Sequence, residues 1–185
     1  MSERECAFDQ NQKRRGTVTS LNISEKKGTR KTPVPGQTVS IRIDSGVEGD
    51  AHAGDWHRQV SFLAQESIDK ARAMGLDVKA GDFAENITTE GIELNTIPVG
   101  TVLKVGDTTV EISQIGKVCH TRCAIYHLAG DCIFPREGIF SVVREEGLIK
   151  VGDTIEVITW GNGTCDATPR EALDEVEAAR AAGTL

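Results

Sequence analysis

Three cysteines and two histidines lie close together in the segment KVCHTRCAIYHLAGDC, which covers residues 117–132. They are Cys119, His120, Cys123, His127 and Cys132. Thiols near imidazoles can close disulfides, bind soft metal ions or act as thiolate nucleophiles. They can also pack in a core as small hydrophobic residues.

A disulfide framework is the interpretation that composition favours least. The chain has 5 cysteines, an odd number, in 185 residues. Its N-terminus, MSERECAFDQNQKRR, lacks the apolar segment of a secretion signal, and no run approaches the roughly 18 apolar residues that a membrane span needs. We therefore expect a cytoplasmic protein with no membrane association, whose thiols are free or bound to a ligand.

Zinc is the first metal to consider for this segment. Four of its residues could supply ligands, namely Cys119, His120, Cys123 and Cys132. However, the neighbouring Cys119 and His120 cannot easily face one ion from a regular strand, and the segment has no second pair of ligands with zinc-finger spacing. Structural zinc remains one alternative.

A reactive or metal-binding thiolate is the more specific interpretation. Arg122 directly precedes Cys123, and Lys117 and His120 are nearby. Positive charge beside a thiol lowers its pKa and so favours the thiolate. A thiolate binds soft metals in preference to calcium or magnesium, so the segment favours a site for a soft metal or for sulfur chemistry.

The formal charge of −7 makes a broad nucleic-acid or anionic-membrane surface an unfavourable interpretation. Against this background, two short basic segments stand out: SEKKGTRK at 24–31, which ends in Lys31, and HAGDWHRQ at 52–59, which contains His52, His57 and Arg58. Either segment could be a solvated loop. Together they could form a pocket for a small anion.

The hydrophobic content of 38% and the chain length indicate a single core. Residues 39–43, 101–105 and 109–115 alternate or are rich in β-branched side chains, as strands are. Two similar stretches, LKVGDTTVEI at 103–112 and IKVGDTIEVI at 149–158, each predict a hairpin with a Gly-Asp turn. Many short strands favour a mainly β fold: a closed or nearly closed β-barrel with a few peripheral helices.

Helices are expected in two places. AQESIDKARAMG at 64–75 places Ile68, Ala71 and Met74 on one face, and Gly75 is suited to end the helix. Near the C-terminus, Thr168 is a suitable N-cap, with Pro169 at the first helical position.

The chain is therefore divided into three parts. We expect a disordered N-terminal tail at 1–15, a β-barrel domain at 16–160, and a C-terminal extension at 161–185 that carries an amphipathic helix.

Six phrases, taken in order, resemble the MOSC domain, which is named for the C-terminal domain of molybdenum cofactor sulfurases. They are GVEGDAHAGDWHRQVSFLAQESI, GDFAENITTEGIEL, IPVGTVLKVGD, QIGKVCHTRCAIYHLAGDC, PREGIF and GLIKVGDTIEV. The similarity extends over residues 16–158. It implies a barrel that holds the molybdenum cofactor (molybdopterin), with a cysteine that ligates molybdenum or carries sulfur.

The resemblance also implies residue roles. The functional thiol is expected in CHTRC, and we favour Cys123 because it follows Arg122, as the cysteine follows an arginine in members that ligate molybdenum. Cys119 is the alternative, since three residues separate the two cysteines here and two do so in some relatives. Further residues are expected to contact the cofactor: Lys31, Arg58 and Arg122 its phosphate, Glu85 and Asn86 its pterin nitrogens, with His52 and His120 beside it.

The resulting functional hypothesis is a molybdenum-cofactor-binding protein that reduces N-hydroxylated compounds. The alternatives are a persulfide sulfur carrier for metal–sulfur assembly and a non-enzymatic zinc- or anion-binding module. The sequence contains no pattern of a pyridoxal-phosphate, iron–sulfur or flavin domain, so the expected partner is a separate electron-transfer protein or a cysteine desulfurase as sulfur donor. It contains no pattern that indicates a particular oligomeric state.

Overall fold

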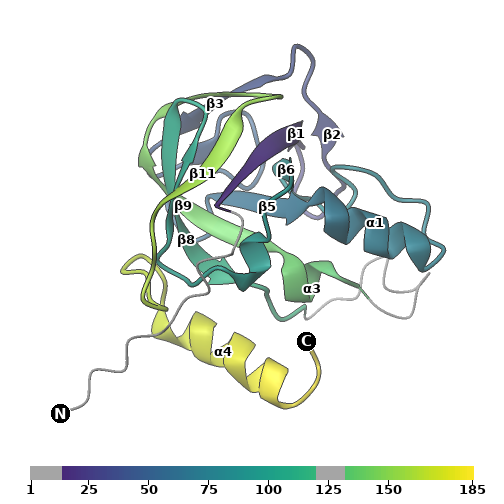
Figure 1. Cartoon of the computed structure of the whole chain (residues 1–185), viewed down its shortest axis with the longest axis vertical. Coiled ribbons are helices and arrows are strands. Elements are labelled where there is room, and N and C mark those ends of the chain that lie inside the picture. Colours follow the sequence, from purple (N-terminus) through teal and green to yellow (C-terminus); the bar gives the residue numbers. More distant parts are fainter. Residues whose placement is uncertain (1–13, 120–131) are drawn as a thin grey trace.

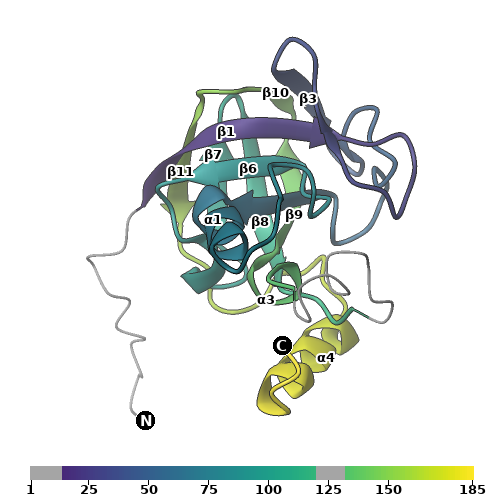
Figure 2. The same cartoon turned by 90° about the vertical axis from the view of Figure 1, so that its right-hand side faces the viewer.

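The computed structural model describes residues 14–119 and 132–185 of the chain. Seven of its strands close into a β-barrel, with helices outside it (Figures 1 and 2). The barrel strands are β1 (Arg15–Ile23), β5 (Val60–Ala64), β6 (Ile87–Glu90), β7 (Val102–Val105), β8 (Thr108–Ile115), β9 (Ile139–Glu145) and β11 (Thr154–Thr159). The fold class predicted from the sequence is confirmed.

The barrel closes because its first and last strands pair. The hydrogen-bonded order is β11-β7-β8-β9-β5-β6-β1, and β1 pairs again with β11. In that final pairing Arg15 lies opposite Glu156, and their side chains form an ion pair of 2.8 Å. Among these seven strands only β5 and β6 are parallel to each other. Because the barrel is closed, each of the seven strands has a hydrogen-bonded neighbour on both sides.

Side chains that point inward fill the barrel. Every strand contributes at least one that is nearly inaccessible to solvent: Val18, Phe62, Ile87, Leu103, Ile112, Val143 and Ile155. The alternation is clearest in β7, where Leu103 and Val105 are buried and their neighbours are half-buried. Each such side chain stabilises the fold by about 1.5–3 kcal/mol through burial. The barrel interior is thus a packed core.

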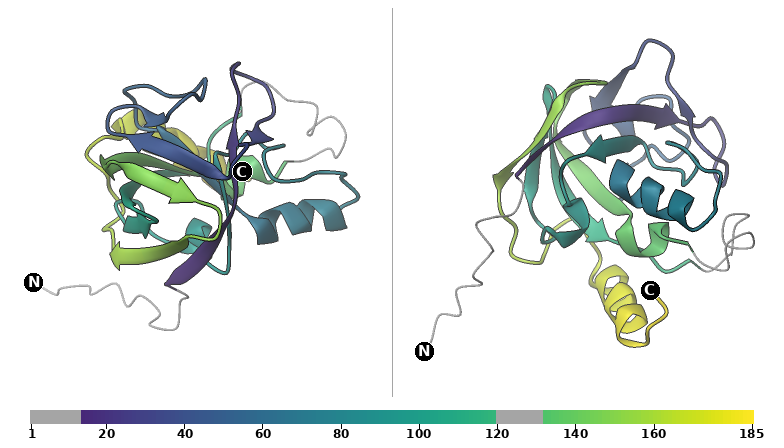
Figure 3. Two further views of the ribbon diagram at one scale, coloured as in Figure 1. Left: turned by 90° about the horizontal axis from the view of Figure 1, so that it is seen from above. Right: turned by 45° about the vertical axis from the view of Figure 1, so that its right-hand side comes forward.

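A second, smaller sheet lies beside the barrel. It consists of β10 (Gly147–Lys150), β3 (Thr38–Arg42) and β4 (Gly46–Val47), while the two-residue strand β2 (Thr32–Pro33) pairs with the end of β1. Its inward side chains, Val39, Ile41 and Ile149, join the barrel core. Figure 3 shows from two further directions how β3 lies at the rim of the barrel.

The helices lie outside the strands. Besides the short 3-10 helix η1 (Leu94–Thr96), these are α1 (Gln65–Ala73), α3 (Phe134–Glu137) and α4 (Arg170–Ala181). In α1, Ile68 and Ala71 are buried as predicted, but Met74 is 54% exposed, because the helix ends at Ala73 and Met74 already belongs to its cap. Gly75 follows with a φ of 91°, as expected of a residue that ends a helix. None of the helices described in 14–119 and 132–185 has both the length and the apolar character needed to cross a membrane.

Only one of the two predicted hairpins exists. β7 and β8 pair directly, with Leu103 opposite Val110. The prediction for 149–158 is wrong: β10 pairs with β3, and β11 pairs with β7 and β1. The turn between β10 and β11 is similar in sequence to the turn between β7 and β8, but it connects the small sheet to the barrel instead of joining paired strands. There Gly152 donates its N–H to the carbonyl oxygen of Val18 in β1 (2.8 Å).

The C-terminal extension packs on the barrel (Figures 1 and 2). The Thr168 hydroxyl donates to the carbonyl oxygen of Ser113 (2.8 Å), the Arg180 guanidinium donates to that of Ile115 (2.9 Å), and Val176 is 3% exposed. Both acceptors lie at the end of β8. The predicted helix is therefore present, one residue later than expected at its start, and it covers the end of the barrel where β8 finishes.

Substitution of Gly46 tests how the small sheet joins the barrel. Gly46 has a φ of 100°, and a Cβ there would lie 2.2 Å from the carbonyl oxygen of Gln59. Gly49 has a φ of 82° with nothing within 4 Å of such a Cβ. We expect Gly49→Ala to lower the free energy of unfolding by about 1–2 kcal/mol, the cost of a left-handed alanine, and Gly46→Ala to lower it by clearly more. Denaturant unfolding measures both, and equal losses would contradict the close contact.

Candidate functional site

A cavity of about 400 Å³ lies at the end of the barrel that α4 covers. Eight of the residues that the structure describes line it, from four parts of the chain: His57, Arg58, Gln114, Lys117, Val118, Cys119, Ala172 and Glu175. The first two lie in the loop before β5, Gln114 lies in β8, the next three follow β8, and the last two lie in α4. The volume is within the range of small-molecule sites, about 300–1,000 Å³.

The side chain of His57 is held in one orientation. Its Nε2 lies 2.9 Å from Oε1 of Gln114, and the Gln114 amide nitrogen donates to the carbonyl oxygen of Gly116 (2.7 Å). Because Gln114 presents an acceptor to the ring, His57 Nε2 is the donor and carries a proton. Burial lowers the pKa of His57, the charge of Arg58 lowers it further, and the Gln114 bond opposes both. His57 therefore favours the neutral form in this environment.

Arg58 is held by aromatic rings. Its guanidinium carbon lies 4.7 Å from the ring centroid of Trp56 and 5.5 Å from that of Phe140. Its Nε is buried and has no hydrogen-bond partner among the described residues. Burial lowers the pKa of Arg58 and the carboxylate of Glu175 opposes this, but a guanidinium stays charged in proteins. Aromatic rings orient the cation without neutralising it, so its Nε–H can serve an anionic ligand.

Lys117 and Cys119 lie in the segment that follows β8, and backbone hydrogen bonds hold the start of this segment in place. Gly116 donates its N–H to the carbonyl oxygen of Gly138 (2.7 Å), and Lys117 donates its own to that of Pro135 (2.8 Å). The ammonium of Lys117 lies 5.4 Å from the centroid of the Phe134 ring, and Cys119 is exposed. Two cationic side chains and one accessible thiol therefore line the same cavity.

Lys31 and the half-buried His52 belong to a separate group around the buried Asp50. The Lys31 ammonium lies 2.6 and 2.7 Å from the two carboxylate oxygens of Asp50, and both side chains are almost fully buried. Asp50 also accepts the backbone N–H groups of Ser24 (3.1 Å) and His52 (2.9 Å), with His52 Nδ1 at 3.5 Å. Although burial alone would raise the pKa of Asp50, the bonds from His52 and Lys31 hold it well below its ordinary value. These contacts occupy the Lys31 ammonium, and Lys31 does not line the cavity.

Glu85 and Asn86 lie in the same buried region. One carboxylate oxygen of Glu85 accepts the N–H of Gly81 (2.5 Å) and the hydroxyl of Thr88 (3.0 Å), while Oε2 is buried without a partner among the described residues. Burial raises the pKa of Glu85 to about 7. The Asn86 amide joins two strands, because its Oδ1 accepts the hydroxyl of Ser61 (2.9 Å) and its Nδ2 donates to the carbonyl oxygen of Asn22 (3.3 Å). Neither residue lines the cavity.

Trp56 connects this buried group to the cavity. Its indole N–H donates to the carbonyl oxygen of His52 (3.0 Å), and its ring supports Arg58. The structure thus divides the residues predicted from the sequence: Arg58 and Cys119 line the cavity, whereas Lys31, His52, Glu85 and Asn86 make hydrogen bonds elsewhere in the fold and are not part of its lining. Three further predicted residues, His120, Arg122 and Cys123, lie outside the described residues.

Sequence reasoning missed Gln114 and Glu175 as cavity residues. Gln114 lies on a strand, two residues before the Gly-Lys-Val-Cys run at 116–119, so its position near the thiol was a usable signal. Glu175 had no such signal, because only the packing of α4 on β8 brings it to the cavity.

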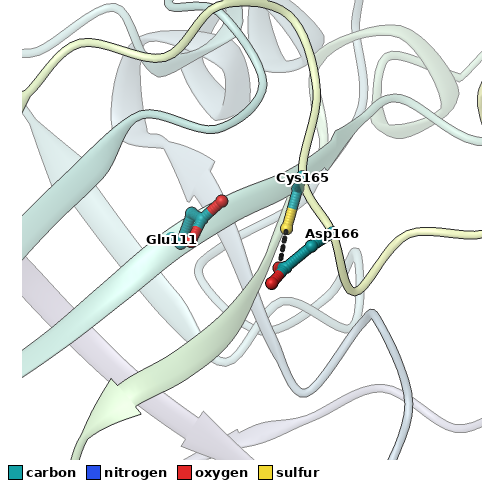
Figure 4. A group of neighbouring side chains, drawn as sticks. All are labelled: Glu111, Cys165 and Asp166. Carbon is teal, nitrogen blue, oxygen red and sulfur yellow. Dashed lines mark hydrogen bonds between the residues drawn. The ribbon is translucent and has the colours of Figure 1, made fainter.

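Away from the cavity, a cluster of potential metal ligands is already bonded to the Arg144 guanidinium. Glu111, Cys165 and Asp166 place one ligand atom each within 4.8 Å of one another, and Figure 4 shows the Cys165 sulfur directed at the Asp166 carboxylate. The Arg144 guanidinium donates to Glu111 (2.7 Å) and to Asp166. Burial raises the pKa of Cys165, which favours the neutral thiol over the thiolate that metals bind. The cluster therefore fixes the C-terminal extension to β8 and β9 and does not suit a metal ion.

Glu85 makes a pH-dependent contribution to stability that can be measured. Its pKa is about 7 in the fold and 4.5 ordinarily, so the folded protein binds more protons than the unfolded chain between these values. The free energy of unfolding must then fall as pH rises from about 4.5 to about 7. Glu85→Gln removes this dependence, and at pH 8 the variant is expected to be more stable than the original by up to about 3 kcal/mol.

Denaturant unfolding from pH 4.5 to 8 measures the effect. Glu90→Gln, which changes an exposed carboxylate on the neighbouring strand, is the matched control. A Glu85→Gln profile parallel to that of the original protein would show that Glu85 does not titrate in this range.

Comparisons with known proteins identify the family. The MOSC domain model matches residues 49–156. No curated protein matches the chain significantly. Among solved structures, the YuaD protein from Bacillus subtilis superposes with a TM-score of 0.66 at 16% identity, covering 79% of this chain and 97% of that one.

Two YiiM structures are also similar, each with a TM-score of 0.58 and 20% identity. The alignment with YiiM from Geobacillus stearothermophilus covers 77% of this chain and 75% of that YiiM chain. The alignment with YiiM from Escherichia coli covers 85% of this chain and 75% of that YiiM chain. At these identities the structural likeness shows the fold alone. The match of the family model over more than half of the 185 residues shows that the chain belongs to the MOSC domain family.

Proposed function

We propose that this protein binds the molybdenum cofactor in the cavity beneath α4, with the cofactor's phosphate at Arg58 and Lys117 and its metal or sulfur centre at Cys119. One observation carries the proposal: two cations, a neutral imidazole and an accessible thiol converge on one cavity of about 400 Å³. A cofactor that combines phosphate with a soft metal needs this pairing of groups.

The residues present fit such a group. The Arg58 Nε is buried without a partner among the described residues, which is costly unless a ligand accepts its hydrogen bond. His57 offers its unprotonated Nδ1, or a second donor when protonated, because Nε2 is already bonded to Gln114. Thiolate sulfur is a ligand that soft metals prefer. When bound, the cofactor would supply a redox-active metal that side chains cannot provide.

The accessible thiol supports Cys119 as the functional cysteine. Of the cysteines in the described part of the chain, Cys165 is buried, Cys132 is half-buried, and Cys119 is exposed and lines the cavity. The prediction for Cys123 stays a prediction from the family resemblance. With Cys119 in this role, the protein either reduces N-hydroxylated compounds with electrons from a separate protein, or carries a persulfide supplied by a cysteine desulfurase.

A zinc-binding role has less support. The one cluster of His, Cys and acidic ligands identified in the described residues has Arg144 bonded within it. Zinc bound to the purified protein without molybdenum would instead support the non-enzymatic zinc-binding module.

Replacing the cavity thiol tests the proposal directly. Protein produced in a host supplied with molybdate is expected to retain molybdenum and pterin in equal amounts, and Cys119→Ser is expected to lose at least tenfold of both, because the hydroxyl is a poor ligand for a soft metal. Cys165→Ser, which changes a buried thiol bonded to the Arg144 cluster, is the control. Elemental analysis and pterin fluorescence give the two amounts.

The same preparations separate the two versions of the function. Turnover of an N-hydroxylated amidine with a chemical reductant by loaded protein alone supports the reductase. One added sulfur on the Cys119 peptide, seen by mass spectrometry after incubation with a cysteine desulfurase and cysteine, supports the carrier. Molybdenum retained in full by Cys119→Ser would remove Cys119 from the site, and bound zinc alone would contradict the proposal.

Replacing Arg58 tests the anion contact. Arg58→Ala is expected to weaken the binding of inorganic phosphate about tenfold, since one charge-assisted hydrogen bond is worth roughly 1.5–3 kcal/mol, and to flatten its salt dependence. Arg42→Ala removes the same charge from an exposed position in the small sheet. Calorimetric titration at two salt concentrations provides the measurement, and equal affinities of the two variants would place the anion elsewhere.

A further inference from the structure

One wall of the cavity comes from outside the matched MOSC region. The family model ends at residue 156, whereas Ala172 and Glu175 line the cavity from α4. This wall is part of the packed structure, because Val176 is buried and Thr168 and Arg180 bond to the end of β8. Upstream, the Arg144–Asp166 contact holds the same segment to the barrel.

The carboxylate of Glu175 changes what the cavity can bind. Glu175 acts electrostatically on Arg58, whose pKa it raises against the effect of burial. A carboxylate in a cavity built for a bare anion is unfavourable, because it repels the ligand's charge. It is favourable when the ligand also carries N–H donors, since carboxylates accept two parallel hydrogen bonds from a planar donor pair.

We propose that Glu175 is a specificity-determining residue that accepts hydrogen bonds from an amidine-type edge of a ligand whose anionic end lies at Arg58 and Lys117. An amidine-type edge is a planar N–C–N unit with N–H donors on both nitrogens. This inference rests on the proposed function and deepens it. Two sources carry the edge: the aminopyrimidinone side of a pterin ring and an amidine substrate.

Two pairs of probes distinguish these sources. 6-Carboxypterin carries the amidine-type edge on a ring with an anionic group, and 6-carboxylumazine replaces its amino group with an oxygen. Benzamidine carries the edge without a pterin ring, and benzamide lacks its second nitrogen. The original protein is expected to bind the first member of at least one pair about tenfold more tightly than the second.

Glu175→Gln is expected to lose most of that preference and to bind inorganic phosphate more tightly, because it removes a negative charge and keeps the side-chain size. Glu177→Gln removes the same charge from α4 at a residue that is exposed, as Glu175 is, but does not line the cavity, and it should keep the preference. Circular dichroism on both variants verifies that the helix remains folded. The pair that loses its preference identifies the source of the edge.

A preference that is equal in Glu175→Gln, Glu177→Gln and the original protein would overturn the inference while leaving the proposed function intact. Failure of the proposed function looks different: the original protein would bind none of the four probes, and Arg58→Ala would leave phosphate binding unchanged. Loss of all preference in both glutamine variants would also overturn the inference, because it would assign the effect to the charge of the helix as a whole.

Discussion

The pairing of β1 with β11 is the constraint on which the rest of the molecule depends. Residues 15–17 and 154–156 lie far apart in the sequence, and their pairing converts an open sheet into a barrel. Within the barrel, β5 and the last residues of β8 both pair with residues 139–141 at the start of β9. The residues that precede β5 and those that follow β8 therefore lie close together, and Arg58 and Lys117 line one cavity.

The protein treats its buried cations in two ways. Lys31 is matched by Asp50 at 2.6 Å and by the backbone donors that fix that carboxylate, so its charge is used within the fold. Arg58 is supported by the rings of Trp56 and Phe140, which orient the guanidinium, and its buried Nε has no hydrogen-bond partner among the described residues. A paired cation contributes to structure, whereas a cation held by aromatic faces is prepared for an anionic ligand. Burial alone would not have separated these two roles.

The sequence predicted the architecture well and the site only in part, for physical reasons. Alternating hydrophobic residues report burial within one strand, so β3, β7 and β8 were predictable. Hydrogen-bond partners depend on the whole fold, so the equivalent Gly-Asp turns at 106–107 and 152–153 gave one hairpin and one crossing between sheets. The same limit applies to the site. Lys31 and Arg58 were equivalent as basic residues in short motifs, and only three-dimensional packing gave one a carboxylate and the other two aromatic rings.

The position of α4 shows how a segment outside the matched family region can contribute to the cavity. Among the described residues, those that the barrel contributes to the cavity are basic, neutral or thiol-bearing, a lining whose chemistry suits an anion and a soft ligand. The extension adds Glu175, the one acidic group among the described lining residues, from a helix whose own sequence pattern indicates only an amphipathic surface. Because Thr168 and Arg180 attach to backbone carbonyl groups of β8, the attachment does not depend on which side chains line the cavity. The wall can therefore vary in chemistry while the barrel beneath it keeps its packing and its closure.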